Sequence, residues 1–265
     1  MPIELPERIR AHAWRQGQVL PRQLYDRLVS QEGGSTAVGA VGVLITQSCN
    51  LVCRDLHAEP NVEVITGERI ATANGLYLHG RNPRQLHLPI QTSGQQVFYE
   101  FFARNRLIFP REWLADAPCN PEYKIGEHDC RTLIAWWAAR YERAALPDEF
   151  QRRLSPIQKK LRGYAKKLVD VPDLFIALNE WEDIGRAEYY EVALTLVMPT
   201  TQYNQPVRRE AVQEIANEIE RLLVKLEGIS INSNVLIKPD DEFTLADLKA
   251  VKRWGDFDHT NSVED

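Results

Sequence analysis

The stretch from Gly39 to Val64 reads GAVGVLITQSCNLVCRDLHAEPNVEV. Its first half is an apolar run with the length of a buried strand, and it ends in a polar turn that carries two cysteines. A second strand follows, in which Val62 and Val64 alternate with Glu63, so the valines face one side and the glutamate the other. The stretch therefore predicts two strands joined by a polar connection, which is the first place to look for a site.

Further alternating runs continue this β pattern to about residue 109. The runs around Leu86, Val97 and Leu107 are separated by turn signals such as Ser93-Gly94 and Asn105. Short strands with this punctuation predict a small, strongly bent sheet or barrel over residues 38–112. Residues 1–37 are expected to form a polar surface arm with a short helix near its end. Residues 113–127 are expected to form a linker loop.

The second half of the chain, residues 128–265, predicts helices followed by an α/β layer. The first helix is expected near residues 129–145, with an inner side that consists of Ile134, Trp137, Tyr141 and Ala144. Ser155-Pro-Ile-Gln158 predicts a capping box at the start of a later helix, and Thr244 with Asp247 predicts another.

Strands are expected at residues 174–178, 192–198 and 229–237, with an amphipathic helix over 207–226 between the last two. The fold class is α+β: a bent N-terminal β domain, then a helical domain with a mostly antiparallel, ferredoxin-like sheet.

Composition and charge exclude several classes of protein. The chain has 265 residues and a net charge of −5, which argues against a uniformly basic nucleic-acid binder. Its four cysteines are too few for a disulfide scaffold of this length. The first residues carry charges throughout and predict no signal peptide, and no run is long and apolar enough for a membrane span. We expect a cytoplasmic protein with no membrane association and no cofactor.

The charges are unevenly distributed. Residues 151–169 carry seven basic residues and no acidic one, whereas residues 170–265 carry nine basic and twenty acidic ones. On a helical wheel the apolar residues of the basic segment, from Leu154 to Leu168, share one narrow sector, so the cations spread over the opposite face. This face predicts contact with nucleic-acid backbone or with an acidic partner protein, and the acidic C-terminal part could also pair with it. The predicted binding residues are Arg152, Lys159, Lys160, Arg162, Lys166 and Lys167.

Two residues of the opening stretch are candidates for catalysis. Cys49 lies at the end of a buried strand and could act as a nucleophile if a nearby cation or histidine lowers its pKa. The alternative, favoured because free cysteine is among the most buried residue types, is a small core residue. Glu63 is the best single acid for a metal-dependent nuclease, although no lysine occurs before residue 124. The spacing of the four cysteines does not match a zinc site, so no metal is assigned.

The segment His79-Gly-Arg-Asn-Pro-Arg-Gln-Leu-His87 gathers two arginines and two histidines around a tight turn. Such a group suits capture of an anion or phosphate, and the alternative is a solvated hairpin turn. His79 is a further catalytic candidate, and Arg81 and Arg84 are candidates for binding.

Three groups of motifs occur along the chain: ITQSCNL with EPNVE near residues 45–63, WAARY with PDEF near residues 137–150, and FTLADL with RWGDFD near residues 243–258. As a set they resemble an uncharacterised bacterial protein family associated with phage-defence or mobile-element loci. In that family an aspartate stands where this chain has Asn50, which weakens a catalytic role for the turn. The resemblance implies no activity. The first domain also resembles the small β-barrels of ribonuclease toxins, which is an analogy of fold alone.

These observations predict an accessory or binding protein of a bacterial, antiphage-type system. It would contact nucleic acid or an acidic protein through its basic helix, within a complex or a homo-oligomer. The alternatives are a nuclease or cysteine-dependent hydrolase, with its site at the Cys49–Glu63 turn and the His79–His87 loop, and a structural oligomeric scaffold.

Overall fold

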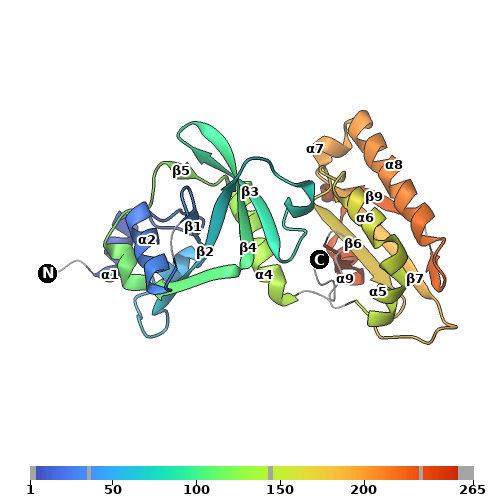
Figure 1. The fold of residues 1–265 in the computed structure, drawn as a ribbon, viewed down its shortest axis with the longest axis horizontal. Coiled ribbons are helices and arrows are strands. Elements are labelled where there is room, and N and C mark those ends of the chain that lie inside the picture. The colour runs from blue at the N-terminus through green and yellow to red at the C-terminus, as the bar shows by residue number, and fades with distance from the viewer. Residues whose placement is uncertain (1–3, 35–36, 143–145, 233–234, 256–265) are drawn as a thin grey trace. The chain divides into compact units, whose positions relative to one another are not determined.

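The computed structural model describes residues 4–34, 37–142, 146–232 and 235–255. It confirms the α+β class, with two sheets and helices around both (Figure 1). The chain forms two compact units. Unit 1 comprises residues 1–73 and 84–138, and unit 2 comprises residues 74–83 and 139–265. This division differs from the expected boundary at 113–127, because most of the first long helix belongs to unit 1 and a short excursion from unit 1 belongs to unit 2.

Unit 1 is built on an antiparallel sheet of five strands in the order β1-β2-β4-β3-β5. On β2, Ile65 pairs with Arg106 of β4, whereas Gly67 pairs with Phe101, so the register shifts between these two positions. Strand β4 therefore contributes extra residues at this point, and the sheet curls. Asn105 lies at this irregularity inside one continuous strand, so the turn expected there is wrong. The strands are β1 Val41–Leu44, β2 Asn61–Ile70, β3 Gln85–Thr92, β4 Gln95–Pro110 and β5 Tyr123–Lys124.

The hairpin between β3 and β4 confirms the Ser93-Gly94 turn. Thr92 pairs with Gln95. Ser93 and Gly94 have φ angles of 44° and 84°, which is the type I′ geometry that matches strand twist.

Helices cover both faces of this sheet. Val64 lies in one core cluster and its neighbour Ile65 in another, as alternation along a strand requires. Residues 5–11 do not form the polar surface arm that was expected. They form a helix with Ile9 fully buried, and the Trp14 indole donates hydrogen bonds to the carbonyl oxygens of Leu114 and Ala117. The helices are α1 Leu5–Ala11, α2 Arg22–Gln31, α3 Ser48–Leu51, η2 Arg111–Ala115 and α4 Glu127–Glu142.

Helix α4 uses a different inner face from the one expected. Leu133 and Trp136 are buried in the core of unit 1, whereas Tyr141 is 72% exposed. Ile134 and Trp137 are partly buried, and Ala144 lies outside the described residues. The burial of Leu133 and Trp136 explains why residues up to 138 belong to unit 1.

Unit 2 has a mixed sheet in the order β10-β6-β7-β8, and β9 also pairs with β7. The pairs β10/β6 and β6/β7 are antiparallel, whereas β8 and β9 run parallel to β7. The expected last strand is divided into β8 and β9. Helix α8 connects β7 to β8, and these two strands are neighbours in the sheet. In a ferredoxin-like sheet another strand would lie between them. The strands are β6 Asp173–Leu178, β7 Tyr190–Met198, β8 Ile229–Ile231, β9 Leu236–Pro239 and β10 Lys252–Arg253, and α8 spans Pro206–Leu223.

The helices of unit 2 bury the apolar stripes that the sequence predicts. Val212 and Ile219 of α8 pack into the same core cluster as Leu161 and Leu168. The remaining helical elements are η1 Gly75–Tyr77, α5 Asp148–Leu154, η3 Ser155–Ile157, α6 Gln158–Ala165, α7 Thr200–Tyr203, η4 Asp240–Glu242 and α9 Leu245–Ala250.

The two expected capping boxes have different outcomes. At α9 the box is present, with Thr244 and Asp247 bonded to each other's backbone N–H groups. At Ser155 it is absent, because the hydroxyl donates to the carbonyl of Arg152 and the chain continues from α5 without an extended residue. The basic segment is therefore one bent helical run, α5–η3–α6. No helix in the described part of the chain combines the length and apolar character needed to span a membrane.

Candidate polyanion-binding surface

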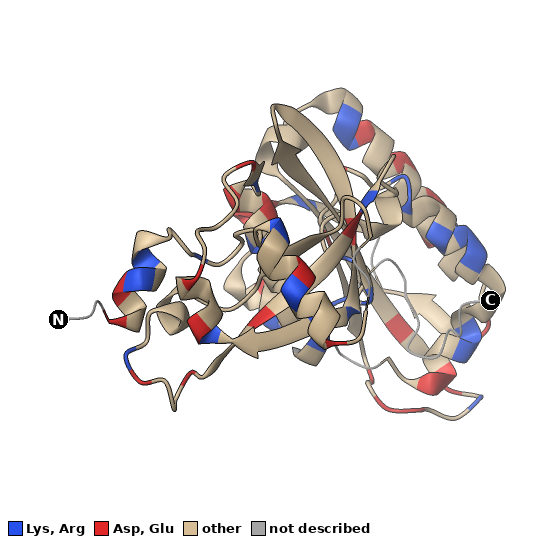
Figure 2. Cartoon of the chain, turned by 60° about the vertical axis from the view of Figure 1, so that its left-hand side comes forward, with Lys and Arg blue, Asp and Glu red and all other residues tan. Residues whose placement is uncertain are grey.

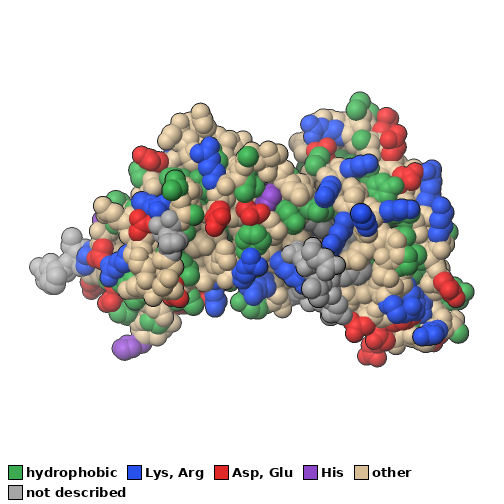
Figure 3. Space-filling view, in the orientation of Figure 1, with side chains coloured by type: hydrophobic (Ala, Val, Ile, Leu, Met, Phe, Trp, Pro, Cys, Tyr) green, Lys and Arg blue, Asp and Glu red, His purple; other side chains and the backbone are tan. Residues whose placement is uncertain are grey.

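Helix α6 and the residues just after it pack on the core of unit 2 through their apolar side and expose their lysines. Leu154 and Leu161 are fully buried and Leu168 is 1% exposed, which confirms the predicted docking face. On the other side four lysines are exposed, and we call them the lysine face: Lys159, Lys160, Lys166 and Lys167. Basic side chains gather over the part of unit 2 where α6 lies (Figure 3).

The lysine face keeps its charge toward solvent. Among the described residues none of its lysines forms an ion pair; only the Lys167 ammonium has a ring contact, 5.7 Å from the centroid of Tyr164. The acidic C-terminal part therefore does not pair with these lysines in the described chain, and the acids of residues 256–265 lie outside it. Helix α8 contrasts with α6, because its ribbon carries both acidic and basic residues (Figure 2).

The other cations of the segment have different environments. Arg152 is exposed but forms a bidentate ion pair with Glu149, at 2.6 and 2.7 Å. Arg153 is only 6% exposed, and its guanidinium bonds to Glu149 and to main-chain carbonyls. Arg162 is half-buried. Of the seven cations in residues 151–169, only the four lysines are exposed and have no acidic partner among the described residues.

The structure removes Arg81 from the predicted binding residues. Its side chain is buried, and the guanidinium donates to the carbonyl oxygens of Leu168 at 3.0 Å and Val171 at 3.3 Å. It also bonds to the carbonyl of Gly75. A cation at the end of α6 complements the helix dipole and the unpaired carbonyls there. Arg81 is therefore a structural residue of unit 2, whereas Arg84 is exposed and lies in unit 1.

The histidines of the predicted anion-binding segment are a half-buried one, His79, and a buried one, His87. His79 adopts a φ of 58°, and its Nε2 lies 2.9 Å from the carbonyl oxygen of Val169. His87 is buried on β3 with its Nε2 3.1 Å from Glu100, and burial lowers the pKa of its imidazole despite the opposing effect of Glu100. The segment does not form one outward cationic turn, because His79 and Arg81 belong to unit 2 and His87 to unit 1.

The two candidates of the opening stretch are not brought together. Cys49 is exposed, and its thiol contacts Gln47 and Asn50 rather than a base. Glu63 forms an ion pair with Arg106 at 3.1 Å, so a cation already occupies its carboxylate. No hydrogen bond links Cys49 to Glu63 within the described residues. The enzymatic alternative stays a prediction that this geometry does not strengthen.

Metal-ligating side chains are dispersed over the described residues. No three His, Cys, Asp or Glu side chains gather there into a group that could hold a metal ion. All four cysteines are free, and burial raises the pKa of the Cys119 and Cys130 thiols, which disfavours the thiolate form.

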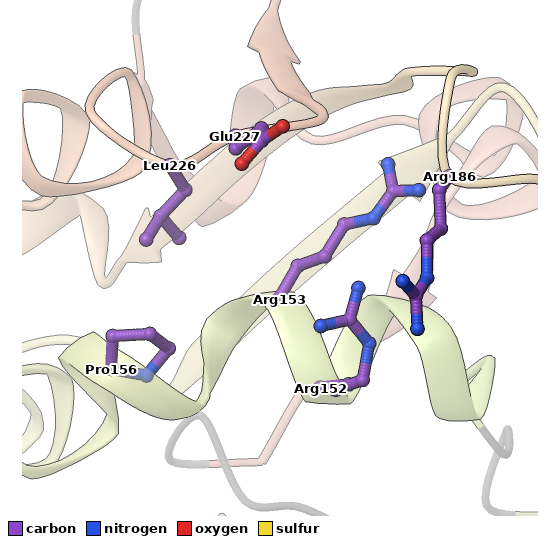
Figure 4. Close-up of a pocket in the computed structure, with 6 residues that line it drawn as sticks. All are labelled: Arg152, Arg153, Pro156, Arg186, Leu226 and Glu227. Carbon is purple, nitrogen blue, oxygen red and sulfur yellow. The ribbon is translucent and has the colours of Figure 1, made fainter.

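A hollow that the sequence did not indicate adjoins α5. It is lined by Arg152, Arg153, Pro156, Arg186, Leu226 and Glu227 (Figure 4). Arg186 could not be recognised from the sequence, because the other residues that line the hollow come from distant segments. The one local signal is that Arg186 is the only basic residue between positions 168 and 207.

No protein-family model, curated protein or solved structure matches this chain. The motif resemblance to a family from phage-defence loci, and the role in such a system, therefore stay predictions from the sequence.

Proposed function

We propose that the protein binds the phosphate backbone of nucleic acid, without base specificity, through the lysine face of α6. The observation that carries this proposal is the exposure of Lys159, Lys160, Lys166 and Lys167 without an acidic partner in the described chain. Lys159 and Lys166 are seven residues apart, which is about 10 Å along a helix axis. Such spacing lets several ammonium groups contact successive phosphates.

Nucleic acid fits this surface better than an acidic protein does. Lysine is depleted in the cores of protein–protein interfaces, which are rich in aromatic residues. The leucines and Ile157 of the basic segment are buried, and its one tyrosine, Tyr164, is half-buried with its hydroxyl 3.4 Å from Glu218. Val169 is the one large aliphatic residue of the segment with an exposed side chain, at 48%. A face of ammonium groups without aromatic anchors suits contacts to phosphates, whose affinity comes from counterion release.

A salt series of binding measurements tests the proposal. Fluorescence anisotropy with a labelled duplex of arbitrary sequence should show affinity that falls steeply with salt. The variant Lys160→Glu/Lys166→Glu should bind far more weakly, and the slope of log affinity against log salt should fall by about 2, or roughly 0.9 for each lost phosphate contact.

The matched control is Lys225→Glu/Lys249→Glu, which reverses two exposed lysines elsewhere in unit 2 and gives the same net charge. If both double variants lose affinity equally, overall charge and not the lysine face governs binding. An unchanged affinity for Lys160→Glu/Lys166→Glu at low salt would contradict the proposal.

A further inference from the structure

The hollow beside α5 has the size of a small-molecule site and a mainly charged wall. Its volume is about 390 Å³. This lies within the range of roughly 300–1,000 Å³ that is typical of such sites. Its walls come from α5, η3, the β6–β7 connection and the turn after α8, all within unit 2. The close-up shows the three arginines on one side and Pro156 with Leu226 on the other (Figure 4).

Arg153 fixes the wall of this pocket. Its guanidinium donates to the carbonyl oxygens of Gly228 at 2.6 Å, Glu188 at 2.8 Å and Gly185 at 3.0 Å. It also lies 5.2 Å from the ring centroid of Tyr190. One buried cation therefore holds the β6–β7 connection and the turn after α8 against α5, so the pocket is formed before any ligand arrives.

The other two arginines keep donors available. Arg186 is exposed and makes no hydrogen bond or ion pair with any described residue. Arg152 uses Nε and Nη2 for Glu149 and leaves Nη1 without a partner in the described chain. Two guanidinium edges at one end of a pocket match the oxygens of a phosphate or carboxylate.

The donors left open at Arg152 and Arg186 favour an anion between them. Three guanidinium groups line the pocket, and Glu149 already bonds Arg152 and Arg153. The other carboxylates nearby are Glu227 in the wall and Asp183 and Glu188, which accept hydrogen bonds from the main-chain N–H groups of Glu149 and Gly185. Pro156 and Leu226 offer an apolar surface at the opposite end, where a flat ring could pack.

We propose that this pocket binds a phosphate monoester attached to an apolar ring system, such as a mononucleotide, with the phosphate at Arg152 and Arg186 and the ring against Pro156 and Leu226. The proposal goes beyond backbone binding and is independent of it, because none of the four lysines of the lysine face lines the pocket.

Calorimetric titration of the full chain with AMP, adenosine and inorganic phosphate tests the pocket. AMP should bind more tightly than either of the others, because it alone reaches both ends. Arg186→Ala should weaken AMP binding roughly tenfold, through the loss of one charge-assisted interaction. Because Arg186 has no bond in the described chain, its replacement should leave the thermal midpoint unchanged.

Control variants separate the two proposals. Lys166→Ala should leave AMP affinity unchanged, and Arg186→Ala should leave the salt slope for duplex DNA unchanged. No heat with millimolar AMP, equal affinity for AMP and adenosine, or an unaltered affinity in Arg186→Ala would each overturn the pocket proposal.

The phosphate could belong to the end of a nucleic acid or to a free nucleotide. Titration with a trinucleotide that carries a 5′-phosphate, and with one that lacks it, distinguishes the two. A gain in affinity from the 5′-phosphate that disappears in Arg186→Ala identifies a nucleic-acid end as the ligand. Competition by AMP alone identifies a free nucleotide.

Discussion

At the scale of single residues, the role of a charged group depends on the partners that the fold gives it, some local and some distant in sequence. Arg81, Arg152, Arg153 and Arg186 are the same residue type, but one supports a helix end, two share a glutamate and one projects into a pocket. A guanidinium in a buried position must find several acceptors, and main-chain carbonyls supply them for Arg81 and Arg153.

Glu149 makes the stability of unit 2 sensitive to acid. Hydrogen bonds from Arg152, and then from Arg153, lower the pKa of its carboxyl to about 2 from an ordinary value of 4.5. Because the folded state holds the proton less tightly than the unfolded state, this stabilisation is present above about pH 4.5 and is lost as the pH falls toward 2. We therefore expect Glu149→Gln to be less stable than the parent at pH 7, with a difference that shrinks through this window.

Urea unfolding of both proteins at pH 7, 4 and 3 measures that difference. Asp55→Asn, at an exposed carboxylate of unit 1, serves as the comparison. A gap between Glu149→Gln and the parent that stays constant down to pH 3 would show that the ion pairs with the two arginines do not govern acid stability.

At the scale of elements, the basic helical run shows what periodicity predicts and what it cannot. The helical wheel identified the apolar side correctly, because a helix that docks on a core must repeat its contacts every three to four residues. The wheel also indicated which lysines are exposed. It did not indicate the bend at η3 or the burial of Arg153, because these depend on tertiary neighbours. The pairing of Arg152 with Glu149 is instead a local contact three residues apart on α5, which the spacing of the two residues indicates.

In the sheet of unit 1, too, periodicity predicted burial, but local signals did not predict the tertiary arrangement. Alternation of Val62, Glu63 and Val64 predicted their burial, since side chains in a strand point to opposite faces. Asn105 carried a turn signal but sits where the β2–β4 register shifts inside one long strand. Local sequence thus marked an irregularity without distinguishing a bulge from a turn. The candidate site was predicted only where it depends on one helix, in the lysine face, and not where several segments meet, in the arginine pocket.

Gly163 gives a prediction at this scale. It lies on the exposed side of α6, and a Cβ atom placed there would meet nothing within 4 Å. Alanine restricts the unfolded chain more than glycine and suits a helix better. We expect Gly163→Ala to raise the free energy of unfolding by about 0.5–1 kcal/mol without changing nucleic-acid affinity.

Chemical denaturation with the anisotropy assay on the same sample checks both parts of this prediction. Gly67→Ala is the contrasting variant, because its Cβ would come within 2.5 Å of the Phe101 ring and should destabilise unit 1. Destabilisation by Gly163→Ala would mean that this part of α6 is not helical in solution.

At the scale of the whole molecule, unit 2 is assembled from two separate parts of the chain. Residues 74–83 leave unit 1 between β2 and β3, belong to unit 2 and return. Within unit 2 the Arg81 side chain supports the end of α6, and the main-chain carbonyl of His79 accepts a hydrogen bond from Arg253 at 3.1 Å. Gly75 lies so close to the carbonyl of Lys166 that a Cβ would come within 2.6 Å of it. The core of unit 2 is therefore completed by residues that lie between two strands of unit 1 in the sequence.

This arrangement predicts which unit Arg81→Ala destabilises. Removing the guanidinium leaves the carbonyls of Leu168 and Val171 without their donor and should destabilise the protein by roughly 3 kcal/mol, since hydrogen bonds from a buried charge are the strong ones. Hydrogen exchange should accelerate in α6 and β6 of unit 2. The β3–β4 hairpin, which begins only a few residues after Arg81, should keep its protection because it belongs to unit 1.

Arg84→Ala, at an exposed arginine three positions further along in unit 1, is the matched control and should leave exchange in α6 unchanged. Faster exchange in the hairpin with α6 unaffected would assign the excursion to unit 1 instead.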